Sequence, residues 1–266
     1  MAFTSIYELK NKAPLIVDYS HWQGRVNTQK LKKMGVVAAI VKAGEVWMRT
    51  AGKPATEDKQ HAWNIEQIKE AGLISGDYYF WHPKAEASKQ ATHYFQISGK
   101  NRTELPPIID VEAFDGYTYK DKVEVGRLLH GMVRAVEDLF GRKPIIYTTN
   151  GLWVNQVGNP DWGKDYLFWL AKYSTTMDFP DPKIRENVVL WQFTDRIALP
   201  GLPTMDGNYW LKSEQKLYEL ASEEGREVDP IVWMPIEIWR IRRGLYPLSK
   251  KNREWLDKQF GRLLPK

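Results

Sequence analysis

Short apolar runs alternate with helix-like stretches along much of the chain, and this alternation constrains the fold more than any other feature. The strand-like runs fall at residues 15–17, 36–41, 76–81, 108–109, 145–147, 167–171 and 188–191. Runs that are apolar at nearly every position are typical of strands covered on both faces, as in a parallel sheet. The chain is therefore expected to have an α/β fold built around such strands.

The helix-like stretches are unevenly distributed between these runs. The clearest covers residues 120–140, carries apolar side chains on one face and is stopped by Gly141, and two more are expected at 58–71 and 85–97. After Lys143 the strands follow one another with little helix between them. Repeated strand–helix units followed by such a region predict an irregular TIM-like (β/α) barrel with fewer helices than strands. An open doubly wound sheet is the alternative, although no glycine-rich phosphate loop follows any strand.

The last part of the chain differs from the rest. We expect a barrel domain over residues 1–212 and a basic, aromatic, helical C-terminal extension over 213–266, with helices at 213–224 and 249–264. From residue 236 to 266 there are nine Lys or Arg against three acidic residues, a balance of +6, whereas the whole chain carries +5. The extension is too short to build a large core of its own, so we expect it to pack on the barrel.

Composition excludes several classes of protein. The 266 residues include no cysteine, which rules out disulfides, thiolate zinc sites and cysteine nucleophiles. No His-Glu-x-x-His pair and no Gly-x-Ser-x-Gly elbow is present, so neither a zinc hydrolase nor an α/β-hydrolase is expected, and no metal or cofactor is predicted. No nucleic-acid-reading motif accompanies the basic segment, and nucleic acid is not an expected partner. No apolar run approaches the roughly 20 residues that span a bilayer, and the N-terminus does not resemble a secretory signal.

Carboxylates and aromatic side chains gather where the predicted strands end. In a (β/α) barrel the working side chains collect at the carboxyl-terminal ends of the strands. Reading those ends in chain order gives Asp18, Glu45, Tyr78 or Tyr79, Asp110, Glu112, Tyr147, Trp169, Tyr173, Trp191, Gln192, Asp206 and Asn208. Aromatic rings pair an apolar face with a polar edge, which suits sugars as well as peptides.

Asp110 and Glu112 are the most informative members of this set. They end the buried run 108–109 and share one face, because strand side chains alternate. Like charges held this close raise one pKa, which suits a proton donor beside a group that stays ionised. A strand that simply runs into an acidic loop would look the same. Carboxylates among aromatic platforms favour glycoside hydrolysis, in which one acid protonates the leaving oxygen and another carboxylate supports the developing positive charge.

The same residues resemble the glycoside hydrolase family 25 lysozymes, which are N-acetylmuramidases. The family's opening motif Asp-x-Ser-x-x-Gln-Gly matches residues 18–24, and its Asp-x-Glu pair matches Asp110 and Glu112. Five further motifs follow in the family's order, at residues 41–45, 76–80, 169–173, 191–194 and 205–210. Together they cover roughly three quarters of the chain. Three positions depart from the family pattern: Gly44 stands for a usual Thr, Tyr79 for a common His, and His82 for an Arg-like residue.

The resemblance implies a barrel with missing helices and cleavage of the β-1,4 bond between N-acetylmuramic acid and N-acetylglucosamine in peptidoglycan. Glu112 would be the general acid, and Asp110, Asp18 and Asp206 would line the same cleft. The sugar-binding wall would include Tyr78, Tyr147, Trp169, Tyr173, Trp191 and Gln192, with Glu45 and Asn208 beside it. The stereochemical course depends on the separation of the carboxylates and is not predicted from the sequence.

Each assignment has a plainer alternative. Asp18 could cap the turn that follows it, and Asp206 could be a turn residue ahead of Gly207. Glu45 could be a solvated loop residue, and Trp169 and Trp191 could be core residues that only border the cleft. Tyr78 and Tyr79 alternate in direction, so only one can face the barrel, and the motif favours Tyr78.

Two classes of function remain. The first is a muramidase that serves as a phage endolysin or a bacterial autolysin, and the second is a non-catalytic wall-binding or virion protein on the same barrel. The intact carboxylate set favours the enzyme. A chitinase-like barrel, which also uses Asp-x-Glu, would have a longer acidic run before the Glu. The N-terminus favours an endolysin made in the host cytoplasm that reaches the wall after release, and the basic extension could make weak contact with anionic wall polymer or a membrane surface.

Overall fold

The computed structural model describes residues 4–9, 12–46, 55–101, 103–112, 122–177 and 181–222. The chain divides into a compact unit, Met1–Glu224, and a second unit, Gly225–Lys266. The predicted helix at 249–264, and everything else beyond residue 222, lies outside the described residues, so the structure leaves the extension as a prediction.

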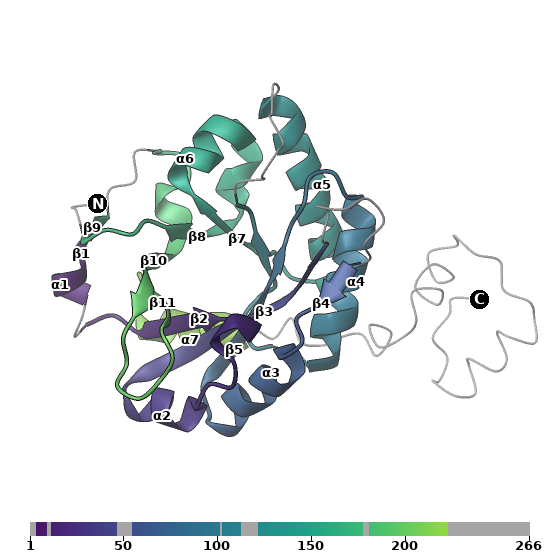
Figure 1. Ribbon diagram of the computed structural model, residues 1–266. Helices are drawn as coiled ribbons and strands as arrows, with labels where there is room; N and C mark the ends of the chain where they lie inside the picture. Colours follow the sequence, from purple (N-terminus) through teal and green to yellow (C-terminus); the bar gives the residue numbers. More distant parts are fainter. Residues whose placement is uncertain are drawn as a thin grey trace, which may run out of the picture. The chain divides into compact units, whose positions relative to one another are not determined.

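The core of the first unit is a closed barrel of eight strands (Figure 1). Its strands, in order around the barrel, are β2 (Leu15–Tyr19), β11 (Met205–Trp210), β10 (Val188–Ile197), β8 (Leu167–Ala171), β7 (Ile145–Thr149), β6 (Ile108–Asp110), β5 (Ile74–Phe80) and β3 (Val36–Val46), and pairing of β3 with β2 closes it. Neighbours are parallel except that β11 runs antiparallel to both β10 and β2. Because β11 is reversed, its first residues lie at the same mouth as the carboxyl ends of the other strands.

Helices cover only part of this barrel. The helices between β2 and β7 are α2 (Thr28–Lys33), α3 (His61–Glu70), α4 (Ala87–Asn101) and α5 (Lys122–Phe140), and in Figure 1 they lie outside the barrel. After β7 the connections shorten to α6 (Asn150–Leu152), a π-helical turn (Trp153–Val157) and 3-10 turns at Asp161–Asp165 and Arg185–Asn187. The irregular barrel with fewer helices than strands, predicted from the sequence, is therefore confirmed.

Short elements complete the unit. A 3-10 turn, His21–Gln23, follows β2, and β4 (Ala55–Glu57) pairs antiparallel with the end of β3. The segments α1 (Ile6–Leu9), β1 (Thr4–Ser5) and β9 (Thr176–Met177) lie together, with β1 and β9 paired. Beyond β11, α7 (Glu214–Ser222) buries Leu217 among residues of the barrel interior. None of the helices in the described ranges is both long and apolar enough to cross a membrane.

The inner faces of the strands change from apolar to polar along their length. On β6, Ile108 packs in the barrel interior, Ile109 packs outward among the residues of α4 and α5, and Asp110 faces inward again. On β2, Ile16 is likewise interior and Asp18 follows it at the mouth. The apolar lower layer excludes water beneath the polar upper layer, which raises the electrostatic effect of every charge placed there.

The glycine that departs from the family pattern has a steric cause. A Cβ on Gly44 would lie 2.5 Å from the backbone oxygen of Thr56 and 2.9 Å from Cδ1 of Ile97. The close passage of β4 over β3 therefore leaves no room for a Thr at this position. Tyr79, the second departure, points outward and bonds through its hydroxyl to Nδ1 of His93 on α4 at 2.9 Å. Its neighbour Tyr78 faces the barrel, among the carboxyl groups of the mouth.

Candidate active site

Asp18 and Asp206 form a hydrogen-bonded carboxyl pair at the mouth of the barrel. They are register partners on the antiparallel strands β2 and β11, and a hydrogen bond joins their side chains. Burial, followed by the charge of Asp206, raises the pKa of Asp18 well above its ordinary value, and burial raises the pKa of Asp206 to about 6. Two carboxyls this close share one proton over a range of pH, because both cannot ionise cheaply.

Two amides hold this pair in place. Gln192 Nε2 donates to Asp18 Oδ2 at 3.0 Å and to Asp206 Oδ2 at 3.2 Å. Asn208 Nδ2 donates to Asp18 Oδ2 at 2.7 Å. Both amides are almost completely buried, so their hydrogen bonds stabilise the ionised form of Asp18 without help from water.

Aromatic side chains fix the two amides in turn. Tyr147 and Tyr173 donate their hydroxyls to Gln192 Oε1 at 2.7 and 3.1 Å, and Trp169 Nε1 donates to Asn208 Oδ1 at 2.8 Å. These bonds orient each amide with its NH2 group toward the carboxyls. Trp169 is 2% exposed and Asn208 is fully buried, so they support the carboxyl pair from below. Tyr173 is 57% exposed and stands at the opening.

Asp110 and Glu112 form a second acidic pair, on and just after β6. Asp110 is buried, and its Oδ1 has no hydrogen-bond partner among the described residues. Burial, then the charge of Glu112, raises the pKa of Asp110 well above its ordinary value. The side chain of Glu112 reaches solvent, and loss of hydration within the cleft is the largest cause that raises its pKa. A carboxyl that reaches the opening yet holds its proton to higher pH suits proton donation.

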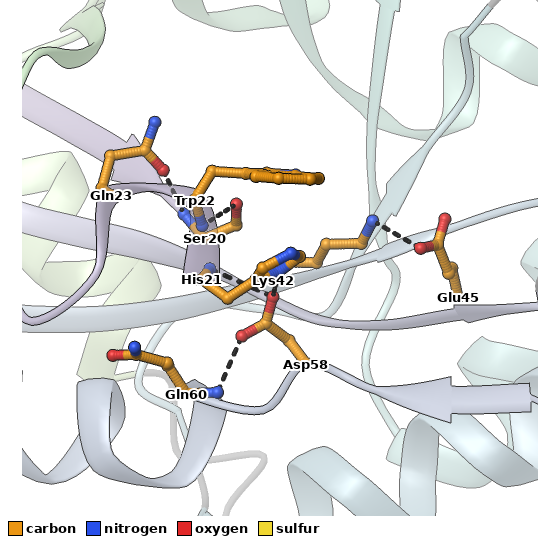
Figure 2. A network of polar contacts seen from close by, with 8 residues as sticks. All are labelled: Ser20, His21, Trp22, Gln23, Lys42, Glu45, Asp58 and Gln60. Atoms are coloured by element: carbon orange, nitrogen blue, oxygen red, sulfur yellow. Dashed lines mark hydrogen bonds and ion pairs between the residues drawn. The ribbon is translucent and has the colours of Figure 1, made fainter.

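Lys42 is a charged side chain of the cleft that the sequence analysis did not predict as part of the site. It lies on the inner face of β3, and its charge lowers the pKa of both Asp110 and Glu112, in opposition to burial. Its Nζ also forms an ion pair with Glu45 Oε1 at 3.1 Å (Figure 2). Two signals in the sequence point to Lys42: it lies within the family motif at residues 41–45, and it is the single charged residue in the apolar run 36–44 of β3.

Tyr78 lies among all four carboxylates. Burial is the main cause that raises its pKa well above the ordinary value, and the charges of Asp110, Asp18, Glu112 and Asp206 add to it in that order. The hydroxyl therefore stays protonated and can donate a hydrogen bond at neutral pH. Strands β2, β5, β6 and β11 thus direct four acids and one phenol into a single mouth.

A pocket of about 400 Å³ opens beside Glu112. Its lining comes from the ends of β6, β7 and β8 and from the turn after β7, and comprises Val111, Glu112, Tyr147, Thr149, Leu152, Gln156, Ala171 and Tyr173. Thr149 and Gln156 were not predicted, because the short π-helical turn that carries Gln156 has no recognisable sequence pattern. The mixture of apolar walls and few polar groups is typical of a small-molecule or sugar site.

Trp191 does not belong to the sugar-binding wall, and that prediction is wrong. Its side chain is fully buried, and its Nε1 donates to the backbone oxygen of Lys172 at 2.8 Å. Gln192, its neighbour on β10, faces the carboxyls, so parity directs Trp191 outward. Glu45 forms an ion pair with Lys42, and its charge contributes to the raised pKa of Asp110.

No group of three or more His, Cys, Asp or Glu side chains in the described part of the chain is arranged to hold a metal ion. Amides, phenols and one ammonium group surround the acids of the mouth.

Comparison with known proteins agrees with this geometry. Residues 17–202 match the family described as glycosyl hydrolases family 25. The chain belongs to this family. The matched segment runs from within β2 past the end of β10 and includes Asp18, Asp110 and Glu112, and Asp206 follows shortly after it.

Individual relatives are distant but cover most of the chain. Lysozyme M1 of Streptomyces globisporus is 27% identical over 222 residues, which are 77% of this chain and 70% of the relative. YegX of Escherichia coli K12 is 27% identical over 191 residues, 70% of this chain, and the match spans 65% of YegX, slightly less than two thirds of its length. The solved structure of a muramidase from Trichobolus zukalii matches with a TM-score of 0.68 at 27% identity, over 79% of this chain and 99% of that one.

Proposed function

We propose that this chain is a lysozyme, an N-acetylmuramidase that hydrolyses the β-1,4 bond between N-acetylmuramic acid and N-acetylglucosamine in peptidoglycan. The observation that carries the proposal is the position of Glu112, an acid of raised pKa at the edge of an open pocket and next to three further carboxyl groups. Family membership and the matches to a named lysozyme and a named muramidase support it.

In this mechanism Glu112 donates its proton to the glycosidic oxygen as the bond to the leaving sugar breaks. Positive charge then develops at the anomeric carbon, and the ionised carboxylates of the cleft stabilise it. The hydrogen bonds from Gln192 and Asn208 favour an ionised Asp18, whereas Oδ1 of Asp110, two residues before Glu112, has no hydrogen-bond partner among the described residues. Asp110 is therefore suited to orient the acetamido group of the substrate or a water molecule.

Digestion of purified peptidoglycan tests the proposal. The wild-type protein should release fragments with new reducing ends on N-acetylmuramic acid, identified by mass spectrometry, and Glu112→Gln should release almost none. Glu66→Gln, an exposed acid on α3, is the matched control and should digest like the wild type. Glycan chains that bind tightly yet stay intact would favour the alternative, a non-catalytic peptidoglycan-binding protein.

We also propose that the chain acts on the bacterial cell wall as a lytic enzyme of the phage endolysin type. The motif order of the family-25 lysozymes supports a lytic role, while the matched relatives come from bacteria and fungi, so a bacterial wall enzyme is the competing assignment. Cytoplasmic expression in bacteria with and without membrane permeabilisation tests release from the host cytoplasm. An endolysin should lyse cells only after permeabilisation, whereas lysis without it would contradict release from the host cytoplasm.

A further inference from the structure

The turn after β2 presents the most exposed large aromatic side chain among the described residues. Trp22 is 81% exposed, compared with 76% for Tyr7, 57% for Tyr173 and 48% for Tyr218. Indoles are usually largely buried, since their apolar area is large. The mechanism above does not use Trp22.

The backbone beneath Trp22 is firmly held. Ser20 and Gln23 form a capping box around the 3-10 turn, in which Ser20 Oγ accepts from the backbone N of Trp22 at 3.3 Å and Gln23 Oε1 accepts from the backbone N of Ser20 at 2.9 Å. This arrangement fixes the direction in which the Trp22 side chain leaves the turn.

The ring itself rests on a supported neighbour. The His21 ring lies 4.5 Å from that of Trp22 with 35° between their planes, and its Nδ1 bonds to Asp58 Oδ2 at 2.6 Å. Asp58, which is buried, also accepts from the backbone N of His21 at 3.2 Å and of Gln60 at 2.9 Å. Figure 2 shows the indole of Trp22 and the carboxylate of Asp58 on opposite sides of His21. Asp58 therefore fixes His21, and His21 supports Trp22 while the indole remains open to solvent.

The position of Trp22 relative to the cleft indicates its use. It follows Asp18 by four residues, at the mouth end of β2. The pocket beside Glu112 is centred on β7, and in the order of the closed barrel four steps separate β7 from β2 in either direction. Trp22 and the pocket thus lie on opposite sides of the mouth, with the carboxyl groups between them.

We propose that Trp22 is a stacking platform for a sugar ring of the glycan chain, at a subsite on the β2 side of the carboxyl groups. This inference rests on the proposed function and deepens it, because it describes an enzyme that binds several successive sugars of the glycan chain. One sugar would occupy the pocket by Glu112, and the chain would cross the carboxylates to lay the C–H face of a further ring on the indole. An aromatic face and the apolar face of a sugar ring associate in this way with little need for hydrogen bonds.

Binding measurements with two glycan lengths test the platform. The protein carries Glu112→Gln so that chains stay intact, and calorimetry compares it with and without Trp22→Ala, using peptide-free peptidoglycan glycan strands of four sugars and of at least ten. The expected result is a Kd about 3- to 10-fold weaker for the long strands and unchanged for the short ones, since only long strands span the mouth. Trp22→Phe should recover most of the lost affinity.

Tyr218→Ala is the matched control. Tyr218 is an exposed aromatic residue on α7, which follows β11 at the end of the barrel away from the carboxyls, and its removal should leave both Kd values unchanged. Equal affinities for long strands with and without Trp22, or no binding of strands by the parent protein, would overturn the platform. The reducing-end assay on the wild type tests hydrolysis separately. If strands bind through Trp22 but the wild type does not cleave them, the proposed function is contradicted and the stacking platform is not.

Discussion

The two acidic pairs of the mouth differ in what surrounds them. Asp18 and Asp206 bond to each other, and two buried amides and their aromatic supports hold them. Asp110 and Glu112 lack such support: one oxygen of Asp110 has no partner among the described residues, and Glu112 reaches the pocket. Lys42 acts on this second pair through its charge.

This difference separates two tasks that one set of acids could not perform together. A carboxyl pair fixed by hydrogen bonds holds its charge in one place, which suits electrostatic stabilisation of a cation. A carboxyl with few partners changes its protonation state at low cost, which suits transfer of a proton. The first pair is therefore expected to respond to substitution through structure and stability, and the second mainly through rate and pH.

The largest effect is expected at Glu112. Glu112→Gln should lower kcat on soluble peptidoglycan fragments by about 10²- to 10⁴-fold with little change in KM, because the amide keeps the shape but gives no proton. Steady-state kinetics measure this, with Glu66→Gln as the exposed control. A kcat within a few-fold of the wild type would show that another group is the acid.

The next effect is expected at Gln192, which ties the first pair together. Gln192→Met should lower the free energy of unfolding by about 1–3 kcal/mol, because Asp18 loses a donor and Tyr147 and Tyr173 lose their acceptor. It should also lower kcat, since the carboxyls are no longer held. Urea denaturation gives the first quantity, and Gln215→Met, at an exposed position on α7, should stay within about 0.5 kcal/mol of the wild type. Unchanged stability at Gln192 would mean that the first pair needs no support from the amide.

The part of this site that could be predicted from the sequence is the part that the apolar runs and the alternation of strand side chains determine. The barrel, its missing helices and the meeting of Asp18, Asp110, Glu112 and Asp206 all follow from apolar runs that end in acids, because parallel strands bring their ends together. Parity also separates Tyr78 from Tyr79. Applied to β10 it would have turned Trp191 outward once Gln192 was placed inward.

Other features depend on contacts that no local pattern encodes. The role of Lys42 requires knowing that β3 lies near β6 through β5, and the shared proton of Asp18 and Asp206 requires their antiparallel register. Gln156 reaches the pocket from a π-helical turn whose geometry depends on the packing of Trp153 beneath it. Such features arise from tertiary structure and had to be observed.

A smaller effect is expected from Asp206, measured as stability against pH. Its pKa rises from the ordinary 3.8 to about 6 on folding, so between those values the folded protein binds more protons than the unfolded chain and stability falls as pH rises. The group is partly exposed, so solvent screening reduces the effect. In Asp206→Asn, the decrease in unfolding free energy between pH 4 and pH 7 should be smaller than in the wild type by about 1–2 kcal/mol. Unfolding free energies at pH 4 and pH 7 give the difference, with Asp138→Asn on the exposed face of α5 as the control. An identical pH dependence in Asp206→Asn and the wild type would contradict a raised pKa at this site.

The smallest effect is expected from substitution of Lys42, which tests the pair Asp110 and Glu112 alone. Lys42 lowers the pKa of Asp110 and Glu112, so Lys42→Met should let both rise further. Glu112 would then keep its proton to higher pH, and both limbs of the pH profile of kcat/KM should move up by about half a unit to one unit, since an ammonium at this range in a cleft contributes about that much. Lys89→Met, an exposed position on α4, should leave the profile in place. If Lys42→Met lowered activity equally at every pH, Lys42 would bind or position substrate instead of tuning the acids, and the second pair would depend on fixed contacts as much as the first.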